Sequence, residues 1–317
     1  MNKININYQF LFVKFPIIFP LFYAFILYQF PNFETELIIV TILLLAETHF
    51  AATWPFLLDK SNNLFIKTNK MALIVLPLII IILSLLGFFL INKLFLLIFF
   101  AANMYHVTRQ SSGVCKLYCK NSNENKFQEI LIYTISFLFF LIGFFRFYLP
   151  IIKDENILFL NLIIATLFIG LCFYYLVKYS YSQNFLVFLT GCLVFYPMCF
   201  VSNPVHAIIM GVTMHYTQYI YLTYNICNLR KKSQLETNKQ PYSNKLFSYF
   251  SIVLLYAIIM AGLSLTGKAE DIYLKQLIII PIIGQMLHFY LDSQLWKFSV
   301  KHNRDNTLSF LKKFITQ

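Results

Sequence analysis

The sequence predicts an all-α fold, a polytopic bundle of transmembrane helices with about ten spans. Of the 317 residues, 59% are hydrophobic and only 12% are charged, about half the charged fraction of a typical soluble domain. The mean hydropathy is +0.68. The apolar residues form long continuous runs, as in membrane helices, rather than the strict alternation of amphipathic strands.

A transmembrane helix needs about 20 apolar residues, and windows of that length select ten segments. The breaks between them contain proline or several polar residues, as at 31–32, 60–63 and 121–126. We expect the polar stretch 230–245 to be a solvated loop. The prediction is one integral membrane domain over 1–317, with spans near 8–30, 35–58, 70–91, 93–115, 127–150, 156–177, 184–201, 204–226, 246–266 and 274–298.

An even number of spans places both termini on the same side, and the basic residues indicate which side. The termini and the connections on their side of the membrane, counted with the adjoining span ends, carry 19 Lys and Arg, whereas the opposite connections and span ends carry four. Because basic residues collect in cytoplasmic loops, both termini are predicted to be cytoplasmic. This asymmetry also explains the net charge of +12 without a nucleic-acid partner. We expect an integral protein of a bacterial inner membrane whose partners are the lipid bilayer and a hydrophobic small molecule.

Histidine is the most informative residue type in the chain. Five of the six His fall in predicted spans: His49, His106, His206, His215 and His288. His206 lies near the outer end of its span, where we expect a structural role. The other four lie 9–11 residues before the cytoplasmic end of spans that all run inward, which places them roughly 13–17 Å from that boundary. Four imidazoles on four parallel helices at one depth predict a shared metal site.

Polar residues one turn from these His supply further candidates. Asp292 is four residues after His288, and we expect it to be a further ligand or to orient one. Thr53 follows His49 at the same spacing. Groups at these positions can hold the second nitrogen of a ligating imidazole. The predicted metal ligands are His49, His106, His215, His288 and Asp292, and the predicted catalytic or substrate-contacting residues are Arg109, Gln110, Gln218 and Glu47.

Several chemistries fit such a set. Neutral imidazoles with a carboxylate suit iron, copper or zinc, and the leading interpretation is a non-haem iron oxygenase acting on a hydrophobic lipid or polyene. Paired His could instead bind a haem between helices. Zinc hydrolysis remains open, with Glu47 or Asp292 as the base. An ion- or proton-coupled transporter would use the same buried polar residues as a relay, although the outer half of the spans is almost entirely apolar. A scaffold without chemistry is the remaining alternative.

Three short segments carry a resemblance to a known family. They are Thr48-His49-Phe50-Ala51, the stretch 206–216, and Leu287-His288-Phe289-Tyr290-Leu291-Asp292. The pattern resembles the Brp/Blh-type polytopic membrane oxygenases, which cleave β-carotene to retinal. The early Pro-His-Gly-type motif of that family is missing here, and the predicted span count is higher. The resemblance implies a His-bound non-haem iron, carried over to His49, His106, His215 and His288.

Overall fold

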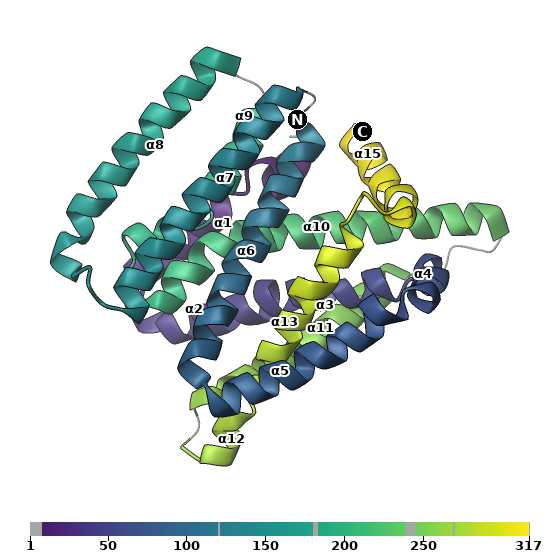
Figure 1. The fold of residues 1–317 in the computed structure, drawn as a ribbon, viewed down its shortest axis with the longest axis horizontal. Helices are drawn as coiled ribbons and strands as arrows, with labels where there is room; N and C mark the ends of the chain where they lie inside the picture. Colours follow the sequence, from purple (N-terminus) through teal and green to yellow (C-terminus); the bar gives the residue numbers. More distant parts are fainter. Residues whose placement is uncertain (1–7, 120, 180–182, 239–244, 269, 317) are drawn as a thin grey trace, which may run out of the picture. The chain divides into compact units, whose positions relative to one another are not determined.

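All regular structure in the computed structural model is helical across the residues it describes, 8–119, 121–179, 183–238, 245–268 and 270–316 (Figure 1). The predicted all-α fold is therefore confirmed. The α-helices are α1 (Ile18–Gln29), α2 (Glu34–Thr41), α3 (Glu47–Leu57), α4 (Asn63–Thr68), α5 (Leu76–Leu90), α6 (Asn92–Tyr118), α7 (Ser122–Gly143), α8 (Ile157–Tyr179), α9 (Gln183–Leu193), α10 (Pro204–Asn238), α11 (Lys245–Leu265), α12 (Ile272–Gln276), α13 (Ile279–Leu295), α14 (Lys301–Asn303) and α15 (Ser309–Thr316).

Five helical segments of the described chain are long and apolar enough to cross a membrane, which suggests a membrane protein. Each coincides with one of the ten predicted spans: Pro31–Leu57, Met71–Leu90, Ser122–Tyr148, Ile157–Tyr179 and Ile272–Leu295. Helices α1, α6, α9, α10 and α11 occupy the other predicted segments. The total of ten spans and the cytoplasmic location of the termini stay predictions.

The chain groups into two compact units. Unit 1 contains 1–38 and 104–218, and unit 2 contains 39–103 and 219–317. The boundaries between the units fall inside α2, α6 and α10.

The core of unit 2 forms where α3 packs against α11 and α13. Two consecutive small residues of α3, Ala51 and Ala52, are buried against Tyr219, Tyr249 and Val253. Small side chains let neighbouring helices of a membrane protein approach closely. This packing fixes α3 and α13 side by side, and these helices carry the candidate site residues of the unit.

Helix α10 continues beyond the point where the sequence predicts a loop. It runs to Asn238, so the expectation of a loop is wrong for 230–238, and 239–244 lie outside the described residues. Arg230 is only 2% exposed. Its Nε donates to the Asn306 carbonyl at 2.6 Å, its Nη2 donates to Thr307 Oγ1 at 2.8 Å, and its guanidinium lies over the Phe56 ring. A buried charge is tolerated when hydrogen bonds replace its hydration. These contacts hold Arg230 against the rest of unit 2, so the helix continues through the polar sequence.

Unit 1 contains one helix contact that leaves no room for a side chain. A Cβ atom added at Gly211 of α10 would lie 1.8 Å from the carbonyl oxygen of Val194 and 3.1 Å from Pro197. Backbone cannot give way as the end of a flexible side chain can. Gly211 therefore sets how closely α10 approaches the segment after α9.

We expect Gly211→Ala to lower the free energy of unfolding by about 1–3 kcal/mol, because the added methyl group overpacks this contact. The matched control is Gly170→Ala in α8, where nothing lies within 4 Å of the added atom. Thermal unfolding in detergent measures both variants. Equal stability of the two variants would contradict the close contact.

The C-terminal segment of unit 2 is held by His302. Its ring stacks on Phe65 with centroids 4.5 Å apart, and its Nε2 lies 2.8 Å from Asn62 Oδ1. Asn62 uses its amide nitrogen on the carbonyls of Phe56 and Leu57, so its oxygen must accept from the imidazole. Asn306 Nδ2 lies 3.2 Å from Nδ1 and donates to it. These bonds suit the neutral imidazole with its proton on Nε2.

Stability is therefore expected to depend on pH through His302. Burial lowers the pKa of His302, the positive charge of Arg230 lowers it further, and Asp305 opposes the shift. Because the unfolded chain binds a proton at a higher pH than the folded one, the contribution of His302 is lost as the pH falls below about 6.5. The melting temperature should fall less steeply on acidification in His302→Gln than in the parent protein. An unchanged pH dependence in this variant would contradict the assignment.

Candidate metal centre

Unit 2 brings together three of the predicted metal ligands. His49 lies on α3, and His288 and Asp292 lie one turn apart on α13. The rings of His49 and His288 meet edge to face with centroids 4.4 Å apart. The three side chains are between 0% and 2% exposed. Two imidazoles and a carboxylate thus share one buried location.

Hydrogen bonds from neighbouring helices orient the carboxylate. Asp292 Oδ1 accepts from the Tyr219 hydroxyl at 2.6 Å and from Thr53 Oγ1 at 3.2 Å. Thr53 Oγ1 also lies 2.6 Å from His288 Nδ1. Thr53 Oγ1 is also 2.9 Å from the Tyr219 hydroxyl. When the Thr53 hydroxyl gives its one proton to Asp292, its oxygen accepts from His288 Nδ1 and Nε2 of His288 is unprotonated.

Two donor atoms of His288 and Asp292 are spaced as the ligands of one metal ion can be. His288 Nε2 and Asp292 Oδ2 are 3.8 Å apart, too far for a hydrogen bond. Metal bonds of about 2.0–2.2 Å to nitrogen and oxygen allow two donor atoms of one ion to lie as much as about 4 Å apart. A second group that fixes the tautomer of a ligating imidazole is a usual feature of metal sites. His288 and Asp292 can therefore offer two donor atoms to one ion, and the ring of His49 lies beside that of His288.

Aromatic rings surround these groups. Phe50 lies 5.1 Å from both imidazoles, measured between ring centroids, and Tyr219 lies 4.5 Å from His49 and 5.3 Å from His288. Both Phe50 and Tyr219 are buried. Such a wall excludes water and strengthens the electrostatic attraction of a cation to the carboxylate.

Glu47 lies on α3 two residues before His49 and has a different hydrogen-bond partner from the three candidate ligands. Its Oε1 accepts from Gln285 Nε2 at 3.4 Å, and its Oε2 has no hydrogen-bond partner among the described residues. Glu47 is 1% exposed. A π-helical turn, Ile42–Ala46, directly precedes it, and such turns are frequent at functional sites. Gln285, one turn before His288, thus binds Glu47. The catalytic role of Glu47 stays a prediction.

Unit 1 contains a second pair of predicted ligands. His106 of α6 and His215 of α10 are buried, with ring centroids 5.7 Å apart and nearly perpendicular planes. His206 has other partners: its Nδ1 lies 2.7 Å from the Tyr23 hydroxyl and its Nε2 lies 2.7 Å from Glu34 Oε1. The prediction that His106 and His215 share one ion with His49 and His288 stays a prediction.

The remaining predicted site residues lie in unit 1. Gln218 is buried and donates to the Val13 carbonyl at 2.6 Å. Arg109 is exposed and Gln110 is half-buried. Their proposed roles as substrate contacts stay predictions.

Sequence reasoning missed the partners that orient Asp292. Spacing along one helix assigns Thr53 to His49 and Tyr219 to His215, each four residues before it. Both act across helices instead. The sequence does show a hydroxyl or phenol one turn from a predicted ligand in each case. It does not show which neighbouring helix that side chain faces.

Comparisons of the chain with protein-family models, with curated proteins and with solved structures gave no match. The functional assignment therefore depends on the geometry of the site.

We expect Thr53→Val to lower the free energy of unfolding by about 1–3 kcal/mol, because it removes the hydroxyl that bonds to His288 Nδ1 and donates to Asp292. The matched control on the same helix is Thr48→Val. Thr48 Oγ1 donates to the carbonyls of Leu44 and Leu45 in the turn before α3, so the control should be nearly neutral. Equal loss of stability in the two variants would contradict the assigned network.

Proposed function

We propose that the protein is a membrane-embedded metalloenzyme, a non-haem iron oxygenase that acts on a hydrophobic substrate. The observation that carries the proposal is the buried group of two imidazoles and one carboxylate formed by His49, His288 and Asp292, with His288 Nε2 and Asp292 Oδ2 3.8 Å apart.

The ligand set favours iron. Two His and one carboxylate on one side of the metal, with the other coordination positions open, are typical of non-haem iron(II) oxygenases. Iron bound in this way would supply the activation of O₂. The aromatic wall formed by Phe50 and Tyr219 and the apolar spans favour a substrate that enters from the lipid. The resemblance to the Brp/Blh-type oxygenases agrees with this proposal.

The protein's own residues have defined tasks in this proposal. Tyr219 and Thr53 hold Asp292 Oδ1, which turns Oδ2 toward His288. Thr53 keeps the proton of His288 on Nδ1, so that Nε2 can bind a cation. The rings of Phe50 and Tyr219 keep water away from the ligand atoms.

Elemental analysis of the purified protein tests the proposal. Iron close to one equivalent per chain is expected in the parent protein. His49→Phe preserves the edge-to-face ring packing but removes the nitrogen donors, and Asp292→Asn preserves the shape but removes the charge. Each variant should lower the iron content about tenfold or more, since even second-shell changes weaken metal binding about 10–100-fold.

The control is His206→Gln, which alters a buried His bound to Tyr23 and Glu34 and should retain the iron. Retention of iron by His49→Phe, or copurified zinc in place of iron, would contradict the proposal.

The variants His106→Gln and His215→Gln test the four-His prediction in the same assay. Loss of iron in both supports it, whereas unchanged iron refutes it and leaves the three-residue centre.

A further inference from the structure

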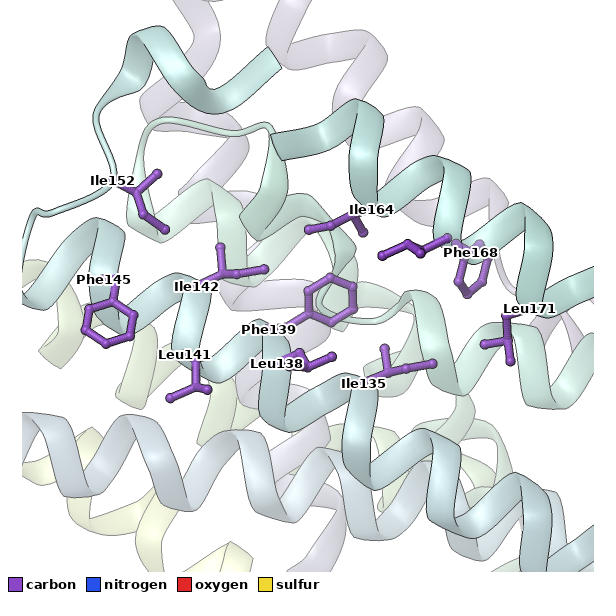
Figure 2. A pocket seen from close by; sticks show the side chains of 11 residues that line it. Ile135, Leu138, Phe139, Leu141, Ile142, Phe145, Ile152, Ile164, Phe168 and Leu171 are labelled. Carbon is purple, nitrogen blue, oxygen red and sulfur yellow. The ribbon is translucent and has the colours of Figure 1, made fainter. Parts of the chain in front are cut away.

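A cavity of about 310 Å³ lies between α7 and α8 in unit 1 (Figure 2). Figure 2 shows Phe139 and Ile142 of α7 turned toward Ile164 and Phe168 of α8. All eleven lining side chains are hydrocarbon, with no nitrogen, oxygen or sulfur atom among them. The cavity has no residue in common with the candidate metal centre.

The cavity opens toward the surroundings of the chain. Two lining residues, Leu138 and Leu167, are more than half exposed. The most apolar window of the candidate span Ile157–Tyr179 has 0% of its residues buried. In a membrane, this helix would therefore contact lipid, and the opening would face the hydrocarbon region.

The size and lining of the cavity restrict its occupant. An apolar cavity of about 150 Å³ in a protein can hold one benzene molecule, so this cavity holds roughly twice as many carbon atoms. Because no lining side chain can form a hydrogen bond, the part of a ligand inside must be hydrocarbon. A segment of an acyl chain satisfies both conditions.

The basic residue Lys153 directly follows a residue that lines the cavity. Ile152, which lines the cavity from the loop before α8, is followed directly by Lys153. The side chain of Lys153 is 74% exposed, and its ion pair with the similarly exposed Glu155 spans 3.6 Å. Such exposed pairs contribute little, so Lys153 can attract another anion. The phosphate of a lipid headgroup is the anion present at the end of a membrane helix.

We propose that the cavity between α7 and α8 binds one phospholipid, with an acyl chain against Phe139, Ile164 and Phe168 and the phosphate at Lys153. The site is independent of the proposed metal centre. It would hold a lipid more tightly than the general lipid-facing surface does, since the chain is enclosed by two helices and its headgroup is bound by a charge.

The test uses the full chain in detergent, stripped of lipid and then supplied with phosphatidylglycerol, with native mass spectrometry as the readout. One bound phospholipid per chain is expected. Ile164→Trp fills the cavity and should lower the affinity for lipid about tenfold or more, equivalent to about 1.4 kcal/mol of binding free energy. The matched control is Ile169→Trp on the same helix, at a residue that is 69% exposed and does not line the cavity, and it should bind lipid normally. Lys153→Ala should weaken binding, whereas Lys275→Ala, an exposed lysine of unit 2, should not.

A phospholipid with a photoactivatable acyl chain examines the parent protein without any substitution. Crosslinks concentrated on the lining residues of α7 and α8 support the site. Crosslinks spread evenly over exposed residues of α8 such as Leu158 and Phe173 would overturn it, as would equal lipid binding by Ile164→Trp and Ile169→Trp. A lipid-free dimer that Ile164→Trp disrupts would also overturn it, because the occupant would then be a second copy of the chain.

Discussion

The candidate centre depends on how the carboxylate of Asp292 is accommodated in an apolar interior. The free energy needed to bury an unpaired charge is far larger than the stabilisation from one contact between helices. The carboxylate must therefore be hydrogen-bonded and paired with a positive charge. Tyr219 and Thr53 supply two donors to one oxygen, Oδ1. The other oxygen lies beside His288 Nε2. A divalent cation between these atoms would balance the negative charge, which the hydrogen bonds alone do not do.

The same hydrogen bonds connect the helices of unit 2. Thr53 belongs to α3, Tyr219 to α10, and His288 and Asp292 to α13. The small residues Ala51 and Ala52 allow α3 to approach its neighbours closely enough for these contacts. Packing and polar contacts therefore determine one another: a bulkier α3 would separate the donors from the carboxylate, and a missing donor would leave a buried charge between packed helices.

The sequence predicts the helical class and the positions of the helices well, because continuous apolar runs of about 20 residues leave few alternatives. It also predicts His49, His288 and Asp292 as neighbours, from the depth of the His and the four-residue spacing on α13.

The sequence does not predict which helix a polar side chain will face. Thr53 forms a hydrogen bond with His288 rather than with His49. Gln285 donates to Glu47, and Gln218 donates to the Val13 carbonyl. Spacing along one helix identifies residues on a common face, whereas these partners are chosen by contacts between helices. Arg230 is a further example, because its burial depends on carbonyls from distant parts of the chain.

X-ray absorption spectroscopy at the iron edge of the purified protein tests the central claim most directly. The account predicts iron with only nitrogen and oxygen neighbours, scattering from at least two imidazole rings, and loss of one ring contribution in His288→Gln loaded with excess iron. A first shell that contains sulfur, or a spectrum of purified protein without imidazole scattering, would contradict a centre formed by His49, His288 and Asp292.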